Sequence, residues 1–129
     1  MFQFVSVLPA QSILTIQVNN VKVNKGAVLV AIYKGEDTYM NKDKYYRVLS
    51  IESTAESVSA DLADVEEGEY AISIFQDTNG DKELNVGMFG PKEPYGFSND
   101  AKGKFGPAKY KDAKFAIKND ERVKKIINL

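Results

Sequence analysis

The chain has 129 residues, which corresponds to one domain with no room for a second large core. It carries 17 Lys and Arg against 18 Asp and Glu, so the net charge of −1 gives no field that favours nucleic acid or an anionic membrane. Cys, His and Trp are absent, which excludes disulfide scaffolds, thiolate or imidazole metal sites and every Ser-His or Cys-His dyad.

The first twelve residues allow two interpretations. The short apolar stretch that ends in Leu8-Pro9-Ala10, before Gln11, resembles the end of a secretory signal, although it lacks a basic beginning. The same residues also fit an ordinary first strand. Residues 13–129 are expected to form a single domain, and no later segment approaches the roughly 18 apolar residues of a membrane span.

The dominant pattern along the chain is an alternation of apolar and polar residues with period two, which is typical of strands. It predicts seven strands, at residues 13–18, 27–33, 45–51, 57–62, 69–76, 113–117 and 124–129. No segment of helix length lies between them, so the fold is predicted as an all-β, seven-stranded antiparallel Greek-key β-sandwich of the immunoglobulin or prealbumin type. An open barrel is the alternative.

Residues 77–112 contain no evident strand. This segment holds six of the nine Gly and three of the four Pro, which define turns but bury little surface. Structureless connections of this length are uncommon in a small domain unless they are functional or anchored. The segment is therefore predicted to be one long ordered loop, anchored by five aromatic residues: Phe89, Tyr95, Phe97, Phe105 and Tyr110.

An acidic run begins this loop. Residues 52–99 carry 11 acidic and 2 basic side chains, and oxygen-bearing residues recur at every second position of the run, as a loop around Ca²⁺ requires. The calcium-loop pattern then fails, because Lys82 stands where Gly is needed and Met88 where Glu is needed. The candidate ligands of a weak calcium site are Asp77, Asn79, Asp81, Glu83 and Asn85. The alternative is a tight Asn79-Gly80 turn with solvated charges.

Several motifs together resemble the bacterial family called domain of unknown function 2141. They are the N-terminal segments Leu14–Ile16 and Lys25–Tyr33, the stretch from Glu67 to Asp77, the acidic run, Phe89-Gly90, the segment Tyr95-Gly96-Phe97-Ser98-Asn99, and the stretch from Lys104 to Ala113. The resemblance covers residues 13–129 and implies a small exported β-sandwich protein of the periplasm or cell exterior, with no established activity. In that family the acidic loop reads Asp-x-Asn-x-Asn-Gly-x-x-Asp, from which this chain departs at Lys82 and Asn85.

Three classes of function are consistent with these residues. The first is a non-enzymatic binding module whose 77–112 loop contacts a protein or cell-surface ligand, with calcium as its only candidate cofactor. Its candidate contact residues are Phe89, Glu93, Tyr95, Phe97 and Asn99. The second is a passive structural module of a surface assembly. The third is a hydrolase that pairs Glu93 with Asp81 or Glu83 as acid and base. The sequence does not indicate an oligomeric state.

Overall fold

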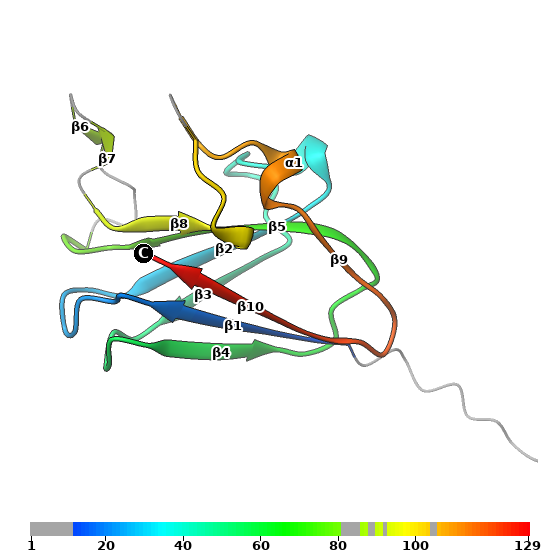
Figure 1. The fold of residues 1–129 in the computed structure, drawn as a ribbon, viewed down its shortest axis with the longest axis horizontal. Helices are drawn as coiled ribbons and strands as arrows, with labels where there is room; N and C mark the ends of the chain where they lie inside the picture. Colours follow the sequence, from blue (N-terminus) through cyan, green and yellow to red (C-terminus); the bar gives the residue numbers. More distant parts are fainter. Residues whose placement is uncertain (1–11, 81–85, 88–89, 92, 104–105) are drawn as a thin grey trace, which may run out of the picture.

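The computed structural model describes residues 12–80, 86–87, 90–91, 93–103 and 106–129, and this part of the chain is almost entirely β-structure (Figure 1). The longer strands are β1 (Ile13–Asn19), β2 (Val28–Lys34), β3 (Arg47–Ile51), β4 (Val58–Leu62), β5 (Gly68–Gln76) and β10 (Arg122–Asn128). The shorter strands are β6 (Val86–Gly87), β7 (Gly90–Pro91), β8 (Tyr95–Phe97) and β9 (Phe115–Ile117). The described helical segments are single turns: η1 (Glu36–Thr38), η2 (Ser98–Asp100) and α1 (Tyr110–Ala113).

Eight of the strands form two sheets, which lie as two layers in Figure 1. The large sheet has the order β3-β2-β5-β8, with β9 also paired to β5. The small sheet has the order β10-β1-β4, and β6 pairs with β7 as a separate hairpin. η1 and α1 lie on the outer side of the large sheet, on the opposite side from the small sheet (Figure 1).

The period-two pattern explains the main core. In β1, Leu14, Ile16 and Val18 are fully buried, while the residues between them are only partly covered. β2 and β5 contribute Val28, Val30, Ile32, Tyr70, Ile72 and Ile74 to the same buried cluster. Side chains of both layers thus share one core, and removal of this apolar surface from water is the main force that stabilises the fold.

The structure confirms a mainly β chain and differs from the prediction in the number of strands and in their direction. There are eight strands in the two sheets, not seven. The eighth is β8, in the segment predicted to lack strands, and it pairs with β5 from Phe75↔Tyr95 to Ser73↔Phe97. In addition, β10 runs parallel to β1, from Ile13↔Arg122 to Asn19↔Asn128, so the sheets are not purely antiparallel. The Greek-key connectivity remains a prediction.

A second, smaller core covers part of the outer face of the large sheet. It joins side chains of β5, β8 and α1: Ala71, Phe97, Ala108, Tyr110 and Ala113. Tyr39, just after η1, packs against this cluster. Two of the five predicted anchors, Phe97 and Tyr110, therefore hold the end of the 77–112 segment on the sheet. Tyr95 is exposed, and Phe89 and Phe105 lie outside the described residues. Within the described residues, no helix has the length and apolar character needed to cross a membrane.

Candidate functional site

The 77–112 segment begins where β5 ends, and a buried glutamine fixes that point. The amide of Gln76 donates to the carbonyl oxygens of Lys22 (2.6 Å) and Gly26 (3.1 Å) and accepts from the amide of Lys22 (2.9 Å). The backbone amide of Gln76 also donates to the carbonyl of Pro94, at 2.9 Å. These bonds hold three separate stretches of chain together at the start of the loop.

Two carboxylates are buried at the same place. Asp77 is 5% exposed and Glu93 is 4% exposed. Oε2 of Glu93 accepts hydrogen bonds from the backbone amide (2.7 Å) and the hydroxyl (3.2 Å) of Thr78, the residue that follows Asp77. Burial of an ionised carboxylate is costly unless hydrogen bonds or an opposite charge compensate it. A pair of buried acids at a loop entrance is an arrangement that a hard cation stabilises.

The structure describes only part of the predicted calcium ligand set. Asp77 and Asn79 lie within the described residues, Asp77 buried and Asn79 exposed. Asp81, Glu83 and Asn85 lie outside them. Within the described residues, no group of three or more Asp or Glu side chains is arranged to hold a metal ion. The structure does bring Glu93, predicted as a ligand-contact residue, next to the acidic run, which sequence spacing alone could not indicate.

The aromatic contact residues have different environments. Phe97 is buried in the second core, whereas Tyr95 is exposed and lies edge-on against Phe97, with ring centroids 6.0 Å apart. Phe89 lies outside the described residues. Tyr95 is thus the described aromatic of this set with a ring accessible to a ligand, and the contact role of the set remains a prediction.

The polar residues after β8 tie the segment to both sheets. The hydroxyl of Ser98 accepts from the amide of Ile72 in β5 (3.0 Å) and donates to the carbonyl of Ala113 at the end of α1. Asn99 donates to the carbonyl oxygens of Asp112 (3.1 Å) and Lys114 (2.8 Å).

Asp100 extends this anchoring to the small sheet. Its two carboxylate oxygens accept from the backbone and side-chain amides of Asn128 in β10, both at 3.0 Å. The second half of the 77–112 segment is therefore fixed to β5, α1 and β10, and this fixation makes the surface it presents rigid.

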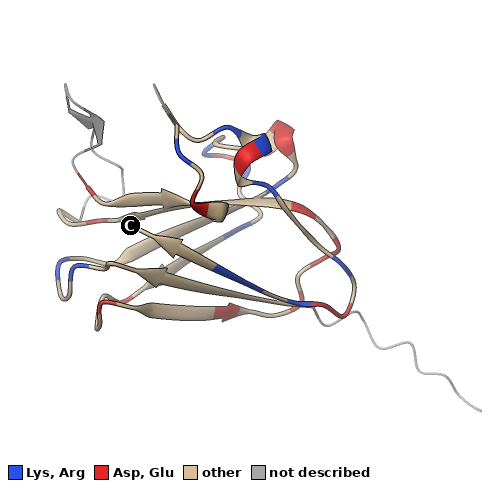
Figure 2. Ribbon diagram, viewed as in Figure 1, with Lys and Arg blue, Asp and Glu red and all other residues tan. Residues whose placement is uncertain are grey.

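A shallow groove of about 550 Å³ lies beside this anchored segment, between η1 and α1. Tyr39 and Met40 come from the η1 side, and residues 107–111 form the other side. The two walls of the groove carry opposite charges. Glu36 of η1 is acidic, whereas Lys109 and Lys111, which flank Tyr110 on the other wall, are basic. Figure 2 shows the acidic residues of η1 and the mixed charges around α1. The lining is otherwise uncharged, which suits an apolar group with polar neighbours.

Four tyrosine rings form a continuous row, and two of them, Tyr39 and Tyr110, line the groove. Tyr45 contacts Tyr33 (centroids 5.4 Å apart), Tyr33 contacts Tyr39 (5.7 Å), and Tyr39 contacts Tyr110 (5.5 Å). The hydroxyl of Tyr39 donates to the carbonyl of Ala108 at 2.6 Å, so it joins the two walls of the groove. The Tyr33–Tyr39 and Tyr39–Tyr110 pairs are edge-on, and such pairs add about 0.5–1.5 kcal/mol each beyond the area they bury.

We expect an alkaline titration to detect this row. Burial raises the pKa of Tyr39 from 10.0 to about 12. The pKa of Tyr33 is raised further, by burial and by neighbouring Tyr45. The pKa of Tyr110 is also raised further, by burial and by neighbouring Glu69. Burial together with Tyr46 also raises the pKa of Tyr70. The stability contributed by the neutral rings is therefore complete below pH 10 and is lost as the pH rises through 12. Part of the tyrosinate absorbance of the folded protein should therefore appear only well above pH 10.0. A titration that is complete near pH 10.0, as in denaturant, would contradict the burial of Tyr33, Tyr39 and Tyr110.

Sequence reasoning missed the groove. Residues 34–44 lie between two predicted strands, and no local pattern places Tyr39 and Met40 opposite residues 107–111. The aromatic anchors of the 77–112 segment were the one usable signal, because Tyr110 does belong to the second core.

A comparison with family models identifies the chain. A model described as an uncharacterised protein conserved in bacteria (DUF2141) matches residues 16–125. The chain belongs to this family. The match includes both sheets and the whole 77–112 segment, so the resemblance seen in the motifs is confirmed. No curated protein and no solved structure matches the chain.

Proposed function

We propose that this family member is a non-enzymatic binding module that contacts a protein or cell-surface ligand through its 77–112 segment. The observation that carries the proposal is the groove between η1 and residues 107–111, because one of its walls is the end of that segment. The loop contributes the surface, and the sheets hold it in place through Ser98, Asn99 and Asp100. Binding residues on a loop positioned by a rigid scaffold are a common design.

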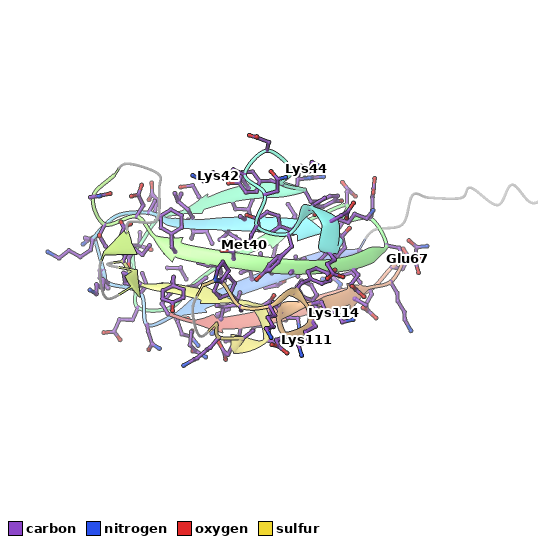
Figure 3. All side chains as sticks on the ribbon, turned by 90° about the horizontal axis from the view of Figure 1, so that it is seen from above. Met40, Lys42, Lys44, Glu67, Lys111 and Lys114 are labelled. Carbon is purple, nitrogen blue, oxygen red and sulfur yellow. The ribbon has the colours of Figure 1, made fainter. Side chains whose placement is uncertain are left out.

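Met40 supports a contact role for this groove. It is 37% exposed, and its backbone has φ 59°, a left-handed conformation that is uncommon for any residue except glycine. Such conformations cost on the order of 1–3 kcal/mol and concentrate at functional sites. Figure 3 shows Met40 between Lys42 and Lys44 on one side and Lys111 and Lys114 on the other. Methionine and tyrosine are both enriched at protein interfaces.

Photo-crosslinking from the groove tests this proposal. A photoreactive amino acid at position 40 should capture a defined partner in extracts of the source bacterium. The matched control carries the same group at position 126, because Ile126 is also exposed (45%) but lies on β10 of the other sheet. Equal capture from both positions, or none from position 40, would favour the passive structural module instead.

A calcium site at the loop entrance is a second proposal, favoured by the buried pair of Asp77 and Glu93. Calcium that binds only the folded state must raise the melting temperature. At about ten times its Kd it stabilises by about 1.4 kcal/mol, a rise of about 5 °C for a domain of this size.

The calcium prediction is checked by thermal melts with millimolar CaCl2, with MgCl2 as the ion control. The variants Asp77→Asn and Glu93→Gln should lose the response. Glu67→Gln, a change at an exposed acid just before β5 and at the opposite end of that strand from Asp77, should keep it. A wild-type melting curve that does not move with calcium would refute the site.

The hydrolase alternative is less well supported. Glu93 is buried and occupied by two hydrogen bonds from Thr78, so it does not face an open cleft in the manner of a catalytic acid. Its predicted partners, Asp81 and Glu83, lie outside the described residues. We therefore propose binding, not catalysis.

Export to the periplasm or cell exterior is part of the proposed function. It rests on the apolar residues before Gln11 and on the resemblance described above. Cell fractionation followed by measurement of the mass of the purified protein tests it. A chain that begins at Gln11 and is found outside the cytoplasm would support export. A chain that keeps Met1 and is found in the cytoplasmic fraction would refute it.

A further inference from the structure

We propose that Asn79 is a site of spontaneous covalent modification, at which the side-chain amide is converted to a carboxylate by attack of the backbone nitrogen of Gly80. The inference concerns the covalent state of the loop and does not depend on the calcium site or on the groove. Its consequence is a new negative charge two residues from Asp77.

The sequence singles out this position. The chain has nine asparagines, and Asn79 is the one that is followed by glycine. The other eight are followed by residues with a side chain. Glycine has no Cβ, so its backbone nitrogen can approach the side-chain carbon of the preceding asparagine with the least hindrance.

The structure leaves the site open for this reaction. Residues 78–80 are exposed. Gly80 has φ +77°, and a Cβ built on it would meet no heavy atom within 4 Å. Water can therefore reach Asn79 and Gly80 in the folded protein.

The reaction needs water as its only co-reactant. The backbone nitrogen of Gly80 loses its proton and forms a bond to Cγ of Asn79. The bond from Cγ to Nδ2 then breaks, and ammonia leaves with that proton, which gives a five-membered cyclic imide. Hydrolysis of the ring at Cγ gives aspartate in an unchanged backbone. Hydrolysis at the main-chain carbonyl gives isoaspartate, in which the chain runs through Cγ.

The product changes the chemistry of the acidic run. A neutral amide that can offer one oxygen becomes a carboxylate that can offer two, in the middle of the sequence Asp77-x-79-x-Asp81. The aspartate form would strengthen attraction for a hard cation. The isoaspartate form lengthens the backbone by one carbon and moves the flanking residues apart.

The test is prolonged incubation of the folded protein at mildly alkaline pH, followed by intact mass measurement and peptide mapping. We expect the mass change of an amide converted to an acid, with both aspartate and isoaspartate peptides at position 79. The variant Gly80→Ala should slow the reaction by about an order of magnitude, because it restores a Cβ beside the attacking nitrogen.

A second variant guards against an indirect effect of Gly80→Ala on the fold. Asn79→Gln keeps the amide and the loop charge but would need a six-membered ring, so it should also stay unmodified. Two results would overturn the proposal. One is modification of the urea-unfolded chain but not of the folded protein, and the other is modification spread evenly over the asparagines. Because the readout is mass, neither result depends on whether calcium binds.

Discussion

Replacement of Gly26 with alanine is expected to destabilise the protein by about 3–5 kcal/mol. Gly26 has φ +105°, and a Cβ at this position would lie 1.9 Å from the carbonyl oxygen of Asp77. The contact is with backbone, so the start of the 77–112 segment itself would have to move. Thermal melts should show a fall of roughly 10–20 °C for a domain of this size.

Gly80→Ala is the matched control for Gly26→Ala. Gly80 also has a positive φ, +77°, but its Cβ position is empty to 4 Å. The same substitution there should cost only about 1 kcal/mol, the ordinary penalty of a left-handed alanine. Equal losses at the two positions would mean that the close approach of Gly26 to Asp77 does not matter.

Replacement of Ser98 with alanine is expected to cost about 2–4 kcal/mol, because it leaves two buried backbone groups without their hydrogen bonds. The hydroxyl of Ser98 joins the amide of Ile72 to the carbonyl of Ala113, and all three residues are buried. Urea unfolding followed by tyrosine fluorescence should show a lower midpoint with an unchanged slope.

Ser50→Ala is the control for this second change, because Ser50 is an exposed residue of the edge strand β3. It should leave the free energy of unfolding within about 0.5 kcal/mol of the wild-type value. If Ser98→Ala behaves in the same way, the segment after β8 is not held by this serine, and the rigidity attributed to the groove wall loses its main support.

Local alternation was sufficient to predict most of the sheet residues. One face of each of four strands points into the core: β1, β2, β4 and β5. The alternation of apolar and polar side chains along the chain therefore shows where these strands lie. Their bounds differ from the predicted ones by one residue or none at each end. Burial of one face determines the position of these strands, and the apolar residues of that face are visible in the sequence.

β8 was missed because its three residues contain no alternation to detect. Tyr95-Gly96-Phe97 lies among glycines and prolines, and it is a strand because it pairs with β5 and its Gly96 packs against the end of β10. A Cβ at Gly96 would lie 3.0 Å from the carbonyl oxygen of Asn128, so the glycine permits this close approach. The cause is a contact between residues about 30 positions apart, which no local pattern contains.

The candidate site was only partly predictable for the same reason. The acidic run and the anchoring aromatics are visible in the sequence, but their spatial partners are not. Glu93 is brought to Thr78 by the return of the chain, and Tyr39 meets Ala108 across 69 positions. Ser98 and Asp100 carry no sequence signal that distinguishes a structural anchor from an exposed contact residue.

The most direct test of the proposed function is the affinity for the partner that is captured from position 40, measured with the wild type and two charge variants. Lys111→Glu changes the groove wall, whereas Lys124→Glu makes the same change on exposed β10 of the small sheet. The proposal predicts that Lys111→Glu weakens binding about tenfold, or about 1.4 kcal/mol, and that Lys124→Glu leaves it unchanged. Equal affinities for all three proteins, or equal losses in both variants, would contradict a binding site in the groove.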